Sequence, residues 1–314
     1  MNIGKRVAGT LTRPAVVAVL ALICCGLWGS AFPCIKIGYR LFQIPAEDAG
    51  AQIVFAGFRF FLAGILALLL GSLLEKRILL PPKAAAGKIV KLSMMQTVFQ
   101  YLFFYLGLAH TTGVKGAIIV GSNSLVTILI AACLFRQEQL TGRKLAGCLA
   151  GLAGVVAANL AQGGLSFSFT FNGEGFVFLS VISYGFSSVF LKKYSHDYDP
   201  VLLSGWQFVL GGGILALMGT LMGGRLEYMT CQGILMLLYL GFLSAVAYSL
   251  WGILLKYNPV SKVAIYGFSN PVMGVFLSAL LLGEGGQACC LQNVIALCLV
   301  SGGIFLVNYR SKPV

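Results

Sequence analysis

Long runs of apolar residues recur along the chain, and short polar connections separate them. A helix needs about 20 apolar residues to cross the hydrocarbon core of a bilayer. Strands that span a membrane alternate apolar and polar side chains, whereas these runs are continuously apolar. The pattern predicts an all-α integral membrane protein with ten transmembrane helices. They are expected at residues 15–37, 51–74, 92–110, 113–135, 142–161, 173–192, 200–223, 232–255, 260–282 and 288–309.

Basic residues gather in alternate connections between these runs. If the N-terminus is cytoplasmic, 17 of the 22 lysines and arginines lie on the cytoplasmic side. Lys36, Arg40, Lys115 and Arg225 then fall on the other side, and Arg59 lies within the second span. Because positive residues favour the cytoplasmic side, both termini are predicted to be cytoplasmic in a multi-pass plasma-membrane protein. The first apolar run is too long for a secretory signal and is expected to remain as the first span.

The composition agrees with a membrane location. Of the 314 residues, 58% are hydrophobic and 10% are charged, whereas soluble domains carry about 25% charged residues. The net charge of +13 is also typical of nucleic-acid-binding proteins. Here, however, the basic residues lie between apolar runs, where they orient a membrane protein. The expected partners are therefore a lipid bilayer and a small-molecule substrate, and no nucleic acid.

The two halves of the chain resemble each other. At an offset of 147 residues, Lys115 aligns with Lys262 and Asn123 with Asn270. The neighbouring serines, Tyr101 with Tyr248 and several glycines also align at this or a similar offset. Residues 15–161 and 173–309 are therefore expected to form two five-helix repeats. Since five crossings is an odd number, the second repeat must be inverted, an architecture that suits alternating access.

Several short motifs support a family resemblance. They are Trp28-Gly29-Ser30-Ala31-Phe32, Arg59-Phe60, Glu138 through Gly147 to Gly154, and a second copy of the last, Leu282-Gly283-Glu284 followed by Gly302-Gly303. Together with the spans and the repeat, they make nearly the whole chain resemble the EamA-type branch of the drug/metabolite transporter superfamily. The resemblance implies secondary transport of small metabolites, often export of amino acids or related compounds.

The sequence departs from that family at one position. The first half has Asn123-Ser124 where a proline is usual, whereas the second half keeps Asn270-Pro271. Proline interrupts the hydrogen-bond ladder of a helix, so Pro33 and Pro271 are expected to supply bends. The bends in the two halves are therefore expected to differ. Gly147 and Gly151 form a small-residue pair that is expected to pack within the monomer rather than between subunits.

Polar and charged side chains within the spans are the candidate site residues. Asn123 and Asn270 lie about halfway along their spans, where an amide needs a partner. They are expected either to contact substrate or to join helices by hydrogen bonds. Arg59 also needs a partner, which is either an anionic substrate group or a backbone carbonyl.

The aligned lysines share helix faces with the aligned serines. Lys115 shares a face with Ser122, and Lys262 shares one with Ser269. A cation at each mouth of a substrate pathway would attract a carboxylate or a phosphate. The alternative is that each lysine marks a helix end and extends its ammonium group to the membrane surface.

A set of amide and aromatic side chains completes the candidate site. Such a mixture would line a cavity for amino acids or flat organic solutes, although packing alone also explains the aromatic residues. The set is Gln96, Gln100, Tyr101, Tyr248, Trp251 and Trp28.

Catalytic chemistry has little support in the sequence. The nine acidic residues fall at or near span ends, so a proton relay through a mid-membrane carboxylate is not expected. The nine cysteines read as small packing residues, and we expect no metal, no cofactor and no enzyme activity. The leading interpretation is a metabolite carrier. A channel or structural subunit and a membrane-embedded enzyme are the alternatives, while the oligomeric state stays open with a monomer slightly favoured.

Overall fold

The computed structural model describes residues 8–111, 113–160, 169–282 and 291–309, and these residues form helices joined by short connections, without a strand. The expected all-α fold is therefore confirmed for the described chain. Six helices in these ranges are long and apolar enough to cross a membrane, namely Pro14–Leu41, Ala49–Glu75, Lys115–Leu134, Phe171–Tyr194, Pro200–Leu221 and Cys231–Tyr257. A shorter apolar helix covers Val294–Asn308. The predicted count of ten crossings stays a prediction.

The helices follow the predicted runs to within a few residues at most ends. The first part of the chain forms α2 (Pro14–Leu41), α3 (Ala49–Glu75), η1 (Lys83–Ala85), α4 (Ala86–Leu92), η2 (Ser93–Phe99), α5 (Gln100–Leu108), α6 (Gly113–Gly121), α7 (Asn123–Leu129), η3 (Ile130–Leu134) and α8 (Gly142–Leu160). The second part forms η4 (Phe171–Gly175), α9 (Phe176–Tyr194), α10 (Pro200–Leu221), α11 (Cys231–Tyr257), α12 (Val260–Ala264), η5 (Ile265–Phe268), α13 (Ser269–Leu282) and α15 (Leu291–Asn308). The motif Gly283-Glu284 lies outside the described residues.

Polar residues define the starts of several helices. The carboxylate of Asp48 accepts a hydrogen bond from the Ala51 backbone N–H at 2.8 Å, at the start of α3. Asp199 caps α10 in the same way, directly before Pro200. Side-chain acceptors satisfy N–H groups that lack a partner in the first turn of a helix, and proline fits that turn. The polar connections therefore fix where each apolar run becomes a helix.

Both asparagines lie next to an interruption in their helices. In the first half, α6 ends at Gly121 and α7 begins at Asn123. Ser122 occupies the break, and its hydroxyl donates to the Ile119 carbonyl at 2.6 Å, a local bond that competes with the helix ladder. In the second half a 3₁₀ segment, η5, precedes α13. The interruption thus forms without proline in the first half, while α2 continues through Pro33.

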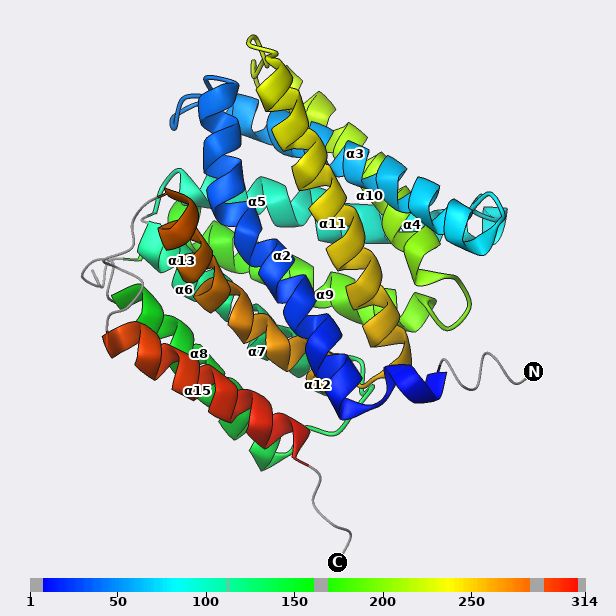
Figure 1. Ribbon diagram of the computed structural model, residues 1–314, viewed down its shortest axis with the longest axis vertical. Coiled ribbons are helices and arrows are strands. Elements are labelled where there is room, and N and C mark those ends of the chain that lie inside the picture. The colour runs from blue at the N-terminus through cyan, green and yellow to red at the C-terminus, as the bar shows by residue number, and fades with distance from the viewer. Residues whose placement is uncertain (1–7, 112, 161–168, 283–290, 310–314) are drawn as a thin grey trace, which may run out of the picture.

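Two close helix pairs join the halves of the chain (Figure 1). In one pair α3 packs along α10, and a Cβ added to Gly212 would lie 2.4 Å from the Phe61 backbone nitrogen. In the other pair α8 packs along α15, and a Cβ added to Gly147 would lie 2.7 Å from the Gly303 carbonyl oxygen. Small residues let helix backbones approach this closely. The expected packing of Gly147 within the chain is confirmed.

The start of α2 and the end of α15 lie at the same end of the bundle (Figure 1). Lys262 of α12 donates to the Thr12 carbonyl at 2.9 Å. Beside it, the carboxylate of Glu138 accepts hydrogen bonds from the Ser261 backbone N–H and side-chain hydroxyl. A surface groove lies between the start of α8 and the end of α15, and its lining includes Arg143 and Tyr309.

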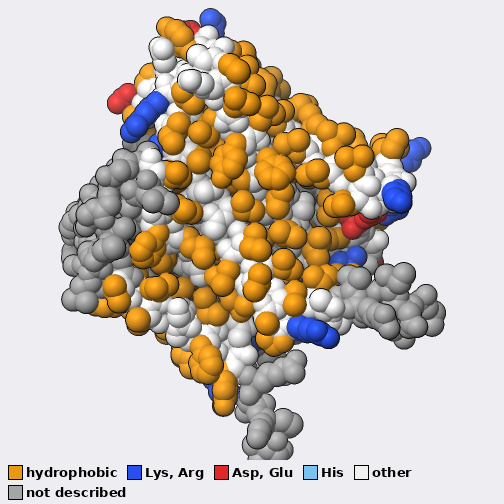
Figure 2. All heavy atoms as spheres, viewed as in Figure 1, with side chains coloured by type: hydrophobic (Ala, Val, Ile, Leu, Met, Phe, Trp, Pro, Cys, Tyr) orange, Lys and Arg blue, Asp and Glu red, His pale blue; other side chains and the backbone are white. Residues whose placement is uncertain are grey.

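Apolar side chains dominate the surface of the bundle. Figure 2 shows them across the face formed by α2, α11 and α13, with lysines, arginines and acidic residues toward the edges of that face. Leu217 of α10 and Phe305 of α15 are among the large hydrophobic residues that are exposed. A water-soluble monomer rarely exposes such an extensive apolar surface, whereas a bilayer would cover it.

Candidate functional site

Six aromatic side chains from five helices meet inside the bundle and form what we call the aromatic cluster. Its members are Trp28, Phe60, Tyr101, Phe208, Tyr248 and Trp251. The ring centroid of Trp28 on α2 lies 5.0 Å from those of both Tyr248 and Trp251 on α11. The structure therefore brings together the four aromatic residues that the sequence nominated.

The centre of the cluster pairs residues that match between the two halves. Phe60 of α3 stacks on Phe208 of α10, with ring centroids 5.2 Å apart and an interplanar angle of 16°. Beside this stack the hydroxyls of Tyr101 and Tyr248 lie 3.1 Å apart and share a hydrogen bond. Stacked and edge-on aromatic pairs add stability beyond the area that they bury. Matching residues thus meet each other where the halves join.

Arg59 lies at the edge of the aromatic cluster with only 3% of its surface exposed. Its Nε and Nη2 atoms donate to the Ser244 hydroxyl at 3.3 and 3.1 Å. That hydroxyl donates in turn to the Leu240 carbonyl at 2.9 Å. Within the described residues Arg59 forms no ion pair. The Cζ atom of Arg59 also lies 4.9 Å from the centroid of the Phe60 ring. A buried guanidinium whose contacts are a neutral hydroxyl and an aromatic ring has no full counter-charge, and burying a charge costs several kcal/mol.

A neutral pair occupies the matching position in the other half. Gln207 follows Arg59 by 148 residues and Ser244 follows Thr97 by 147, close to the offset that aligns the repeats. The Thr97 hydroxyl donates to Oε1 of Gln207 at 2.8 Å. The two halves therefore hold equivalent side-chain pairs, but only the pair that contains Arg59 carries a charge. This difference gives the cluster a positive side and a neutral side.

Four of the nominated amides have buried carbonyl oxygens without a partner in the described part of the chain. They are Gln96, Gln100, Asn123 and Asn270. Nε1 of Trp28 is likewise buried without a partner there. Buried polar atoms in native proteins are nearly always hydrogen-bonded, so each of these atoms calls for water or a ligand. Unpartnered carbonyl oxygens accept hydrogen bonds and so match a ligand that donates them.

The segments that carry the asparagines pack on each other. A Cβ added to Gly267 of η5 would lie 2.6 Å from Oγ of Ser124, which follows Asn123. Ser269 is buried at the start of α13, directly before Asn270. The two interrupted helices therefore meet next to both asparagines.

The nominated lysines pair with residues that are not members of the aromatic cluster. Lys115 forms an ion pair with Glu174 at 3.0 Å, and the Thr111 hydroxyl donates to the same carboxylate at 2.7 Å. Lys262 contacts Thr12 at the end where the chain termini lie. Each lysine thus joins one half of the chain to the other.

Sequence reasoning missed three polar members of the site. Ser244, Thr97 and Gln207 lie in apolar runs as ordinary small or neutral residues, and none was nominated. The repeat held a signal for Gln207, because Phe60 and Phe208 align at the same offset as Arg59 and Gln207. Among the described residues no three His, Cys, Asp or Glu side chains group as metal ligands.

Comparison with known proteins adds a family match. The profile of the EamA-like transporter family matches residues 15–160 and again residues 171–309. A WAT1-related chloroplastic protein of Arabidopsis thaliana is 28% identical over 66% of this chain, and this chain spans 51% of its length. An uncharacterized transporter of Synechocystis is 26% identical, with 91% of this chain and 88% of that protein covered.

Another relative has a more specific name. A probable amino-acid metabolite efflux pump of Escherichia coli is 28% identical, over 93% of this chain and 96% of its own. One crystal structure superposes with a TM-score of 0.75 at 18% identity, and the superposition covers 94% of this chain and 96% of the other. At this identity the structural match concerns the fold alone.

Proposed function

Because this chain belongs to the EamA-like transporter family, we propose that it is a secondary transporter that exports small metabolites across the plasma membrane by alternating access. In this proposal the chain crosses the membrane ten times as two inverted five-helix repeats, with both termini in the cytoplasm. Matching contacts between the halves support this architecture. In one direction α2 packs on α11 and α13, and in the other the equivalent helix α9 packs on α5 and α7.

The observation that carries the proposal is a set of buried polar atoms inside the bundle, with Arg59 beside the aromatic cluster. Arg59 is buried without an anion in the described chain, and four amide oxygens are buried without donors there. A substrate that brings an anion and hydrogen-bond donors would satisfy both kinds of group.

We propose that the substrate is an amino acid or a related compound with a carboxylate. The planar guanidinium of Arg59 suits a carboxylate, because it can donate two parallel hydrogen bonds. Trp28, Tyr248 and Trp251 would pack against an apolar side chain. The name of the Escherichia coli relative, a probable amino-acid metabolite efflux pump, agrees with this chemistry. The proposed site comprises Trp28, Arg59, Gln96, Gln100, Tyr101, Ser122, Asn123, Tyr248, Trp251, Ser269 and Asn270.

The lysines at the two ends would act on access rather than on substrate binding. In this proposal the ion pair of Lys115 with Glu174 closes one end of the bundle, and the contact of Lys262 with Thr12 closes the other. In alternating access the site opens to one side at a time. Each contact would therefore form when its own end is closed.

Counterflow in proteoliposomes tests this function. Vesicles that contain the purified chain and an unlabelled amino acid should take up the labelled compound in a saturable way. Empty vesicles are the control, and Arg59→Gln should lose most of this uptake. Absence of saturable exchange across a panel of amino acids and their derivatives would refute the proposed function. Single-channel currents in planar bilayers would instead favour the alternative of a channel.

A further inference from the structure

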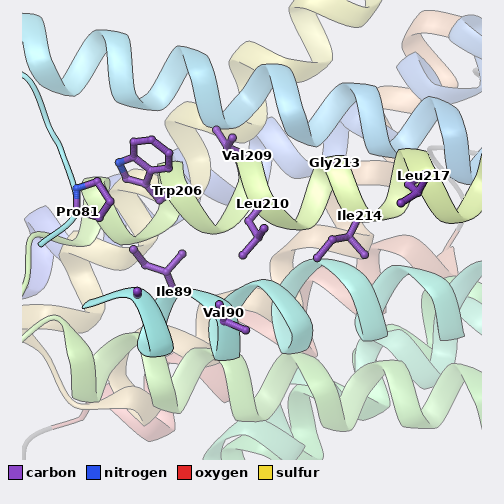
Figure 3. Close-up of a pocket in the computed structure, with 10 residues that line it drawn as sticks. Pro81, Ile89, Val90, Trp206, Val209, Leu210, Gly213, Ile214 and Leu217 are labelled. Atoms are coloured by element: carbon purple, nitrogen blue, oxygen red, sulfur yellow. The ribbon is translucent and has the colours of Figure 1, made fainter. Parts of the chain in front are cut away.

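A groove of about 480 Å³ runs along α10 on the outside of the bundle (Figure 3). Ile89 and Val90 of α4 form one wall, and Leu210, Gly213 and Leu217 of α10 line the other side. From Trp206 to Leu217 the lining follows α10 for about 16 Å, at the 1.5 Å rise per residue of a helix. An apolar groove of this length, lined by exposed residues such as Val90 and Leu217, fits a segment of an acyl chain.

A connection lies over one end of the groove. The indole N–H of Trp206 donates to the Leu79 carbonyl at 2.9 Å and holds this connection against α10. The Leu79 side chain is buried, whereas Ile78 and Leu80 are exposed. Tryptophan and exposed apolar residues next to basic residues are typical of the membrane–water interface. The covered end of the groove therefore has the character of the headgroup region.

Basic residues lie in η1 and α4, next to this end. Lys83 precedes Ala86 and Val90 by one and two helical turns, so it lies on the helix face that lines the groove. Lys88 is paired with Asp197 at 3.0 Å. Among the described residues no ion pair forms at Lys83 or at Lys91. The rim thus keeps a positive charge that is complementary to a phosphate group.

We propose that this groove binds an anionic phospholipid, with an acyl chain along α10 and the phosphate beside Lys83. Surface lysines attract anionic lipids by about 1 kcal/mol each, and the predicted topology puts this rim on the cytoplasmic side. The groove supplies the second component of the site, because its apolar walls hold the chain in one place. The site is separate from the aromatic cluster and does not depend on the transport proposal.

Native mass spectrometry of the full-length chain in mild detergent tests the headgroup. The probes are phosphatidylglycerol and phosphatidylcholine with identical acyl chains. The wild type should retain phosphatidylglycerol preferentially, and Lys83→Gln should reduce that preference about fivefold. Lys36→Gln, which removes a lysine predicted to lie on the opposite side, is the matched control. Glycerol phosphate without acyl chains should not compete.

A second substitution tests the groove itself. A Cβ added to Gly213 would meet no atom within 4 Å, so Gly213→Leu should fold normally while its side chain occupies the groove. This variant should lose retained lipid of either headgroup. Gly302→Leu on α15, also without a neighbour within 4 Å, is the matched control. Equal retention of the two lipids by the wild type, or full retention by Gly213→Leu, would overturn the proposal.

Discussion

Replacing Arg59 with glutamine separates a substrate-binding role of this residue from a structural one. The substitution removes the positive charge beside the aromatic cluster and leaves an amide, the group that Gln207 supplies in the other half. A glutamine can still hydrogen-bond the Ser244 hydroxyl, which now accepts from Arg59 at 3.1 Å. The change therefore mainly concerns charge.

The expected effects on binding and on stability have opposite signs. Truncating one partner of a buried charge pair costs about 2–5 kcal/mol, and about 1.4 kcal/mol is a factor of ten. Arg59→Gln should thus weaken carboxylate binding at least about 30-fold. The ligand-free protein should be equally stable or more stable, because the buried charge has no counter-ion within the described chain.

Thermal shift and counterflow measure these two effects. An amino acid should raise the melting temperature of the wild type but not that of Arg59→Gln. The corresponding amide lacks the carboxylate, so it should shift the melting temperatures of the two proteins by similar amounts. The double variant Arg59→Gln/Gln207→Arg moves the charge to the matching position and should recover part of the carboxylate binding. Unchanged carboxylate affinity, or a ligand-free melting temperature lowered in Arg59→Gln, would refute this reasoning.

Three further predictions concern other contacts. Tyr101→Phe and Tyr248→Phe each remove the same hydrogen bond, which is worth about 1 kcal/mol. In a thermal melt the double variant should therefore lose no more stability than one single variant, and a loss equal to the sum of both would contradict the pairing. Gly212→Leu should abolish folded protein in size-exclusion chromatography because its Cβ would meet the Phe61 backbone at 2.4 Å, whereas Gly213→Leu should elute normally. Glu174→Gln should remove the ion pair with Lys115 and increase the thiol labelling of cysteines introduced nearby. Unchanged labelling would argue against a closing contact.

The positions of the helices could be predicted from the sequence, but most contacts between them could not. Apolar runs and capping residues such as Asp199 are local, so they fix where a helix begins. Which side chains meet depends on how each helix is rotated and how closely it approaches its neighbour. Sequence reasoning therefore nominated Arg59 without finding Ser244 as its partner.

The interruption before Asn123 shows the same division between local and tertiary information. The family pattern directed attention to a missing proline, yet the helix breaks at Ser122. The lysines were nominated from their alignment and from the helix faces that they share with Ser122 and Ser269. Whether Lys115 faces a solute or Glu174 depends on where α9 and η4 pack, and the sequence does not contain that placement in any local pattern.

The two glycine-lined seams have a consequence for how the chain can be divided. The α3–α10 and α8–α15 pairs each take one helix from either side of the connection near residue 165. A fragment that ends there would expose its two seam surfaces to lipid, with no helix from the other half to fill them. Two fragments made separately in one cell should therefore associate through these two seams into a working unit.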